Sequence, residues 1–232
     1  MIPKAFITAW RTEAPWAEDA QVEQDLVISR ALVSLYTTPG LAERLAFRGG
    51  TALYKLHLLP AARYSEDLDF VQIKPEPIGD TLDIIRGTLD SWLGEPRRVF
   101  KEGRVNLVYR FDSEDAPPLQ LRLKIEINTR EHFSALRLEK IPVNVENPWF
   151  SGLAEVTSFP LVELLSTKLR ALYQRKKGRD LFDLWFATDQ REDLDIDRLL
   201  QCFHRYMDEG GHQVSRAQFE ENLHHKAGDQ DF

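Results

Sequence analysis

The sequence feature that most constrains the fold is a strict alternation of apolar and polar residues in LQLRLKIEI, residues 119–127. Leucine or isoleucine occupies every second position, and Gln120, Arg122, Lys124 and Glu126 lie between them. Successive side chains of a β-strand point to opposite faces of the sheet, so a period of two predicts a strand. The chain is therefore predicted to contain a sheet with one buried and one polar face.

The rest of the chain divides into segments with helical and with strand-like patterns. Helices are predicted at 17–38, at 80–94 and from Thr51 to about 59. A short strand or turn is predicted at 45–50, and further strands at 68–73, 104–111 and 136–145. From about Pro160 the pattern is helical nearly to the end. We therefore predict an α+β fold with two domains, an α/β core with an N-terminal helix (1–150) and a helical domain (151–232).

Composition restricts the environment in which the chain folds. Of its 232 residues, 43% are hydrophobic and 29% charged, which is enough for a buried core and is typical of a soluble globular protein. No apolar run reaches the about 18 residues of a transmembrane helix, and the N-terminus does not resemble a signal peptide. The single cysteine, Cys202, excludes an internal disulfide framework. We expect a cytoplasmic protein without a membrane partner.

The charge is unevenly distributed. A net charge of −7 argues against a protein that coats nucleic acid. Residues 168–179, KLRALYQRKKGR, nevertheless carry six basic residues and no acid. This segment is either a local surface that binds phosphates or simply a solvated helix end, and spacing leaves both interpretations open.

Two acids share one face of the strand-like segment DLDF, residues 67–70, which leads into the predicted strand at 68–73. Asp67 and Asp69 are two positions apart, so they point to the same side, while Leu68 and Phe70 face the core. Like charges so close repel unless a cation neutralises them. Carboxylates at this spacing could hold a pair of divalent metal ions, and Mg²⁺ prefers such oxygen ligands. The alternative is a polar strand edge without a ligand.

A third acid, Glu126, lies on the polar face of the strand at 119–127. If that strand lies beside Asp67 and Asp69, three carboxylates converge above one sheet. The alternative is an ordinary ion pair between Glu126 and Lys124.

A glycine pair precedes the helix that begins near Thr51. Gly49 and Gly50 allow backbone N–H groups to approach an anion, and a helix N-terminus favours negative charge. Thr51 could cap the helix or bind a phosphate oxygen. A phosphate-binding turn followed by metal-binding acids indicates a site for a nucleoside triphosphate with Mg²⁺.

A lysine occupies an apolar helical stripe. On a helical wheel, Lys168 falls in the centre of the stripe formed by Leu161, Leu164, Leu165 and Leu172. A lysine there either extends its ammonium group to water at the edge of the core or projects toward a triphosphate. Further along, Asp180 and Asp183 share one helical face, where they either pair with Arg175 and Arg179 or position the lysine or substrate.

Three segments of the chain, in order, are RGGTALYKLHLLPAARYSEDLDF, KIEIN and LLSTKLRALYQRKKGRDLFDLW. They resemble the successive motifs of the AbiEii/AbiGii-type nucleotidyltransferase toxin family, within the DNA polymerase beta-like nucleotidyltransferase superfamily. The resemblance implies a small mixed sheet with flanking helices and a C-terminal helical bundle. It also implies Mg²⁺-dependent transfer of a nucleoside monophosphate from an NTP. Some members are toxins of toxin–antitoxin or phage-defence systems, and some modify the tRNA acceptor end, so expected partners include tRNA or another RNA and a cognate antitoxin protein.

The resemblance also assigns roles to residues. Gly49, Gly50 and Thr51 match the phosphate-binding turn, Asp67 and Asp69 the metal-binding pair, Glu126 the second motif, Lys168 the third, and Asp180 and Asp183 the fourth. The candidate catalytic residues are Asp67, Asp69, Glu126 and Lys168, the first three as Mg²⁺ ligands. The candidate nucleotide-binding residues are Gly49, Gly50, Thr51, Ser65, Lys168 and Asp183.

Two other functions stay open. The same site could serve a nucleotidyltransferase or phosphotransferase that acts on a small hydroxylated molecule, which suits the acidic net charge. Alternatively, the chain could be a nucleotide- or protein-binding relative in which the acids are structural.

Overall fold

The computed structural model of the chain describes residues 2–229 and 232, and they divide into two compact units. The first unit consists of the residues up to Phe133 together with Leu138–Ser158, and the second of Ser134–Arg137 together with Phe159–Phe232. The predicted domain boundary between 150 and 151 falls at the start of strand β7 (Phe150–Ser158), which pairs with β6 (Glu139–Asn147). The structure thus places the division after Ser158.

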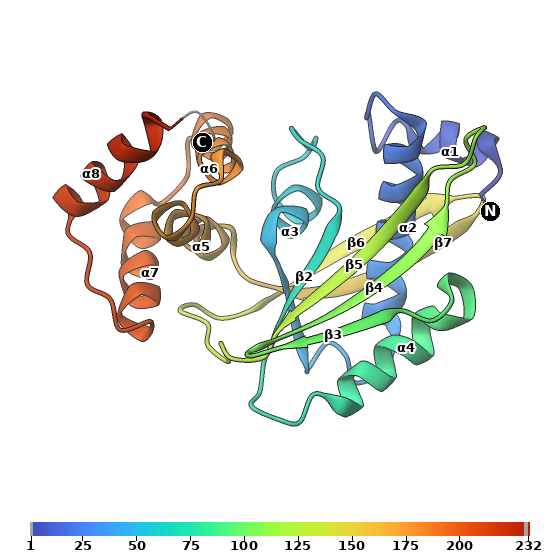
Figure 1. Ribbon diagram of the computed structural model, residues 1–232, viewed down its shortest axis with the longest axis horizontal. Helices are drawn as coiled ribbons and strands as arrows, with labels where there is room; N and C mark the ends of the chain where they lie inside the picture. The colour runs from blue at the N-terminus through green and yellow to red at the C-terminus, as the bar shows by residue number, and fades with distance from the viewer. Residues whose placement is uncertain (1, 230–231) are drawn as a thin grey trace. The chain divides into compact units, whose positions relative to one another are not determined.

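Within the first unit, the described residues form one sheet of seven strands in the order β3-β4-β5-β2-β1-β7-β6 (Figure 1). The remaining strands are β1 (Leu45–Arg48), β2 (Asp67–Gln72), β3 (Arg97–Lys101), β4 (Arg104–Asp112) and β5 (Gln120–Asn128). Two neighbouring pairs, β2 with β5 and β1 with β7, are parallel, and the other pairs are antiparallel. The predicted α+β class with a mixed sheet and flanking helices is confirmed.

Helices α2 (Asp19–Thr37) and α4 (Gly79–Leu93) cover one face of this sheet (Figure 1). Helix α2 packs on β2, β5 and β7, and α4 packs on α2 and β4. Leu68, Phe70 and Ile125 are buried, and the ring centroid of Tyr36 in α2 lies 6.2 Å from that of Phe70. The apolar faces of β2 and β5 are therefore turned toward α2, and their polar residues point to the opposite face.

Two short helices complete the first unit. Helix α1 (Lys4–Trp10) packs on α2, and α3 (Gly49–Leu56) follows β1 directly and packs on β1 and β2. Asp25 of α2 joins both, because its Oδ1 accepts hydrogen bonds from Trp10 Nε1 (2.9 Å) and from Lys55 Nζ of α3 (3.0 Å). One buried carboxylate thus fixes three helices to one another.

The second unit contains helices α5 (Leu161–Gln174), α6 (Gly178–Gln190), α7 (Ile196–Glu209) and α8 (Arg216–Ala227). Glu163 of α5 is fully buried, and its carboxylate accepts hydrogen bonds from the backbone N–H groups of Ala135 (2.6 Å) and Leu136 (2.9 Å) and from Tyr206 Oη of α7 (2.7 Å). Segment 134–137 therefore belongs to the helical unit although it lies between two strands in the sequence.

The predicted helices and strands largely recur, with three omissions. The helices at 17–38 and 80–94 correspond to α2 and α4, and the strand at 119–127 corresponds to β5. Helix α1 and strands β3 and β7 were not predicted. Strand β3 is a mostly exposed edge strand without apolar alternation. In β7, Leu153 is 63% exposed while its smaller neighbour Ala154 is buried, so the order of hydrophobic residues does not follow which residues are buried.

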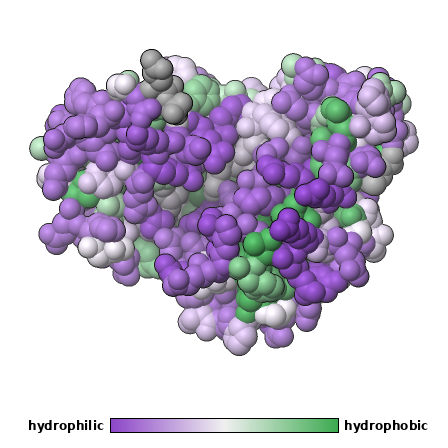
Figure 2. Space-filling view, in the orientation of Figure 1, coloured by the Kyte–Doolittle hydropathy of each residue, from purple (hydrophilic) through white to green (hydrophobic). Residues whose placement is uncertain are grey.

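The surface is consistent with the composition. Figure 2 shows one face of the molecule, on which hydrophilic residues predominate and hydrophobic residues form a narrow band. In the described part of the chain, every helix is too short or too polar to cross a membrane.

Glu23 of α2 makes the stability of the fold depend on pH. It is 1% exposed, its Oε2 accepts a hydrogen bond from the backbone N–H of Glu114 (2.9 Å), and its Oε1 has no hydrogen-bond partner. Burial raises the pKa of Glu23 from 4.5 to about 7. The folded chain therefore holds this proton more tightly than the unfolded chain does.

We expect the free energy of unfolding to fall by roughly 1 to 3 kcal/mol as the pH rises from 4.5 to about 7, because ionised Glu23 is desolvated. Glu23→Gln should remove this part of the pH dependence, whereas Glu43→Gln, at an exposed position of the same unit, should retain it. Urea unfolding at a series of pH values measures the difference. Equal pH dependence in the wild type and Glu23→Gln would contradict the prediction.

Candidate active site

The site is built on the parallel pairing of β2 with β5. In this register Asp67 lies opposite Lys124, and Asp69 lies opposite Glu126. Because side chains alternate along each strand, all four point to the polar face of the sheet. The strand of Asp67 and Asp69 thus lies beside that of Glu126, which is the condition for the predicted convergence of the three acids, and neighbouring strands of a sheet lie about 4.8 Å apart.

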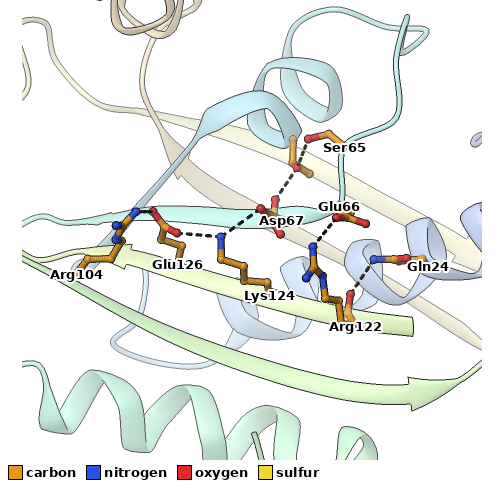
Figure 3. Close-up of polar contacts among 9 residues, drawn as sticks. Gln24, Ser65, Glu66, Asp67, Arg104, Arg122, Lys124 and Glu126 are labelled. Atoms are coloured by element: carbon orange, nitrogen blue, oxygen red, sulfur yellow. Dashed lines mark hydrogen bonds and ion pairs between the residues drawn. The ribbon is translucent and has the colours of Figure 1, made fainter. Parts of the chain in front are cut away.

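Two basic side chains of the protein contact Asp67 and Glu126 (Figure 3). Lys124 Nζ lies 3.3 Å from Asp67 Oδ2 and 2.9 Å from Glu126 Oε2. Arg104 Nη1 on β4 lies 2.9 Å from Glu126 Oε1. Both carboxylate oxygens of Glu126 are thus held by cations, and Lys124 connects Glu126 to Asp67.

The pKa values of Asp69 and Glu126 are shifted in opposite directions from their ordinary values. Burial raises the pKa of Asp69, and the negative charges of Asp67 and Glu126 raise it further. Burial also acts to raise the pKa of Glu126, but the hydrogen bonds from Arg104 and Lys124 outweigh it, so the net shift is downward. The positive charges of Arg48 and Lys124 act to lower the pKa of Asp69, but they do not outweigh its burial and the two neighbouring acids.

The residues present fit a divalent cation at the Asp67–Asp69 pair. Asp67 Oδ1 is buried without a hydrogen-bond partner, so one ligand oxygen is available, and carboxylate oxygens are the ligands that Mg²⁺ prefers. Across residues 2–229 and 232, no three His, Cys, Asp or Glu side chains are grouped closely enough to hold a metal ion. Glu126 could join the pair as a ligand only by giving up a contact with Lys124 or Arg104.

Gly49 lies directly beside Asp69. Its φ of +86° falls in the left-handed region, and a Cβ built there would lie 2.3 Å from Asp69 Oδ2. A side chain at position 49 is therefore excluded both by the backbone conformation and by the carboxylate. At Gly50, a Cβ would lie 2.6 Å from Arg63 Nη2, so a guanidinium group also borders the glycine turn.

Helix α3 begins at Gly49, two residues earlier than predicted, and this changes the role of Thr51. The N-cap residue is Arg48, which makes no side-chain capping bond, so Thr51 is not the cap. Its buried hydroxyl instead donates to the carbonyl oxygen of Asp67 (2.5 Å) and lies 2.9 Å from Ser65 Oγ. Thr51 and Ser65 thus fix the first residue of β2 against the glycine turn.

The second group of predicted residues lies in the second unit. Lys168 Nζ on α5 is 2.9 Å from Asp183 Oδ2 and 3.5 Å from Asp180 Oδ1, and both aspartates are fully buried on α6. Arg175 Nε is 2.7 Å from Asp180 Oδ2. Lys168 is itself buried among the predicted leucines of α5, so its charge is balanced by the aspartates within the helical unit.

Sequence reasoning missed two basic residues near the site and one contact of a third. The ion pair between Lys124 and Glu126, one of the two alternatives given for this strand, is present, but the contact of Lys124 with Asp67 was not foreseen. The positions of Arg104 beside Glu126 and of Arg63 beside Gly50 were also missed. The alternation in 119–127 places Lys124 on the correct face, but the opposing residue follows only from the strand register.

We expect Gly49→Ala to lower the free energy of unfolding by roughly 2 kcal/mol, because the new methyl group requires an unfavourable φ and displaces the Asp69 carboxylate. The matched control is Gly87→Ala in α4, where a Cβ meets no atom within 4 Å. That exposed helical position should gain about 0.5 to 1 kcal/mol. Urea unfolding of both variants tests the pair, and a Gly49→Ala variant as stable as the wild type would refute the close approach.

Comparison with known proteins relates this geometry to a family. The family model described as nucleotidyl transferase AbiEii toxin, type IV TA system, matches residues 30–232. Among solved structures, MenT4, a nucleotidyltransferase toxin from Mycobacterium tuberculosis H37Rv, is similar with a TM-score of 0.64 and 18% identity, covering 97% of this chain and 88% of that one. JHP933 from Helicobacter pylori is similar with a TM-score of 0.54 and 18% identity, covering 92% and 83%. The comparison with curated proteins gives no match.

At this level of identity the solved structures support the fold, and the family model, which spans most of the chain, supports the activity. The predicted resemblance is therefore confirmed: the chain belongs to the AbiEii nucleotidyltransferase toxin family and is a nucleotidyltransferase.

Proposed function

We propose that the chain transfers a nucleoside monophosphate from an NTP to a hydroxyl group of an RNA acceptor, with tRNA foremost, in a Mg²⁺-dependent reaction. The observation that carries this proposal is the Asp67–Asp69 pair on one strand face, beside a glycine turn at the start of a helix. Bound Mg²⁺ would lower the pKa of the attacking hydroxyl and neutralise charge on the phosphates.

The chain's own residues would bind and orient the substrate. Asp67 and Asp69 would hold the metal. The backbone N–H groups of Gly49 and Gly50 at the start of α3 favour an anion, because they lie at the positive end of the helix dipole. Thr51 and Ser65 keep this turn in place against β2. The resemblance of the motifs assigns Lys168 to charge neutralisation on the triphosphate and Asp183 to nucleotide binding, and the 2.9 Å contact between Lys168 Nζ and Asp183 Oδ2 fixes the position of the lysine side chain.

In the transfer, the acceptor oxygen forms a bond to the α-phosphorus while the bond from that phosphorus to the bridging oxygen breaks. Pyrophosphate leaves with the bond's electron pair, and the hydroxyl proton passes to a site carboxylate or to water. Glu126 would act as a third metal ligand or as the proton acceptor. Because both of its carboxylate oxygens contact basic side chains, Arg104 and Lys124, Glu126 is a poor proton acceptor, and we favour the ligand role.

An RNA acceptor is supported by the basic segment that connects α5 and α6. Lys176 and Lys177 are exposed there, as is Arg179 in the first turn of α6, and such side chains bind a phosphate backbone without reading its sequence. The acidic net charge supports the second candidate, a small hydroxylated acceptor. As a toxin of an abortive-infection or other toxin–antitoxin pair, the chain would act on cytoplasmic RNA and be countered by a cognate antitoxin protein.

The test is incubation of the purified chain with Mg²⁺, each of the four α-³²P-labelled NTPs and total tRNA. We expect the wild type to label tRNA. The Asp67→Asn/Asp69→Asn variant should label at least about a hundredfold less tRNA, and no tRNA should be labelled in EDTA. The control Asp83→Asn, at an exposed position of α4, should behave as the wild type. Transfer to small hydroxylated molecules but not to RNA would refute the RNA acceptor, and labelling in EDTA would refute the metal dependence.

A further inference from the structure

Lys124 occupies an unusual place among the residues of the site. The polar face of β5 presents Arg122, Lys124 and Glu126 in succession, and the parallel register sets Lys124 opposite Asp67 (Figure 3). Its ammonium group reaches across to one strand and along its own, so that it contacts one carboxylate on each. The lysine thus lies between two of the three acids proposed to bind the metal.

These contacts lie on two of the carboxylates that a metal ion would share, and at Asp67 they take Oδ2 while Oδ1 has no hydrogen-bond partner. Lys124 Nζ lies 3.3 Å from Asp67 Oδ2 and 2.9 Å from Glu126 Oε2, and the side chains of Lys124, Asp67 and Glu126 are 23%, 28% and 22% exposed. Charges that are partly shielded from water interact more strongly than charges in bulk solvent. An ammonium group and a divalent cation that share these ligands would repel each other at a separation of a few ångströms.

We propose that Lys124 is a displaceable counter-ion of the active site: its ammonium group holds Asp67 and Glu126 together in the metal-free chain and leaves them when a divalent cation binds. This inference rests on the proposed metal site. Lys124 is then a positioning residue, because it acts on the metal through the carboxylates. The consequence of these contacts is that the charges of Asp67 and Glu126 are balanced in the folded chain before a metal binds. The competing ammonium group also lowers the affinity of the site for the metal.

The neighbouring Arg122 provides a matched control. It lies on the same face of the same strand, two residues before Lys124, and carries the same charge. Its ion-pair partner, however, is Glu66, at 3.0 Å from Arg122 Nη2 to Glu66 Oε1. Removing Arg122 therefore takes one positive charge from the strand without freeing either site carboxylate.

The experiment measures Mn²⁺ binding to the full chain by electron paramagnetic resonance at constant ionic strength, without nucleotide. We expect Lys124→Met to bind Mn²⁺ about tenfold more tightly than the wild type, because the competing ammonium is absent. Lys124→Arg and Arg122→Met should stay within about twofold of the wild type. Lys124→Gln provides a second neutral variant if Lys124→Met does not fold. Asp67→Asn/Asp69→Asn should abolish Mn²⁺ binding at this site.

Thermal unfolding gives a second readout that does not depend on activity. In EDTA, Lys124→Met should have a lower Tm than the wild type, because the negative charges of Asp67, Asp69 and Glu126 are then balanced by one positive charge fewer. Added Mn²⁺ should raise its Tm by more than it raises that of the wild type, since tighter binding to the folded state stabilises it more.

The outcomes separate this inference from the metal site on which it rests. Saturable Mn²⁺ binding in the wild type, with equal or weaker binding in the neutral Lys124 variants, would overturn the counter-ion role alone. An equal gain in Mn²⁺ affinity in Lys124→Met and Arg122→Met would also overturn it, because the gain would then come from removing any positive charge from the strand. No saturable binding in any variant, or unchanged binding in Asp67→Asn/Asp69→Asn, would overturn the proposed metal site itself.

Discussion

The site depends on the parallel, in-register pairing of two strands in the middle of the sheet. β2 and β5 are far apart in the sequence, yet their pairing sets Asp67 beside Lys124 and Asp69 beside Glu126. A shift of one residue would turn the carboxylates toward α2 and Phe70 toward the polar face of the sheet. Burial of Leu68, Phe70, Ile125 and Ile127 therefore fixes the register, and the register brings the acids together.

The glycine turn is attached to the same strand by a second set of contacts. Gly49 has no Cβ that would collide with the Asp69 carboxylate, and the Thr51 hydroxyl donates to the carbonyl oxygen of Asp67. The start of α3 and the start of β2 are thus held as one structure. An anion at the helix N-terminus and a cation at the acids would be bound by groups whose relative positions are set by the backbone, which suits a metal-bound triphosphate.

Sequence reasoning recovered the elements whose burial follows hydropathy. The alternation of 119–127 predicted β5 and its polar face, and the spacing of Asp67 and Asp69 predicted their shared direction. It missed β7, where Leu153 is exposed and Ala154 buried, and it placed the start of α3 at Thr51, because a threonine after two glycines is typical of a cap. The contacts of Lys124 with Asp67 and of Arg104 with Glu126 depend on strand order and register, which one sequence does not encode locally.

The central claim is that Asp67 and Asp69 form the metal site of this nucleotidyltransferase. The most direct test is a crystal structure of the full chain with Mn²⁺ and a non-hydrolysable NTP analogue, in which anomalous scattering locates the metal. The account predicts a peak bound by carboxylate oxygens of Asp67 and Asp69, with the triphosphate at the Gly49–Gly50 turn. Manganese bound elsewhere with the nucleotide, or nucleotide bound with no metal at these aspartates, would contradict it.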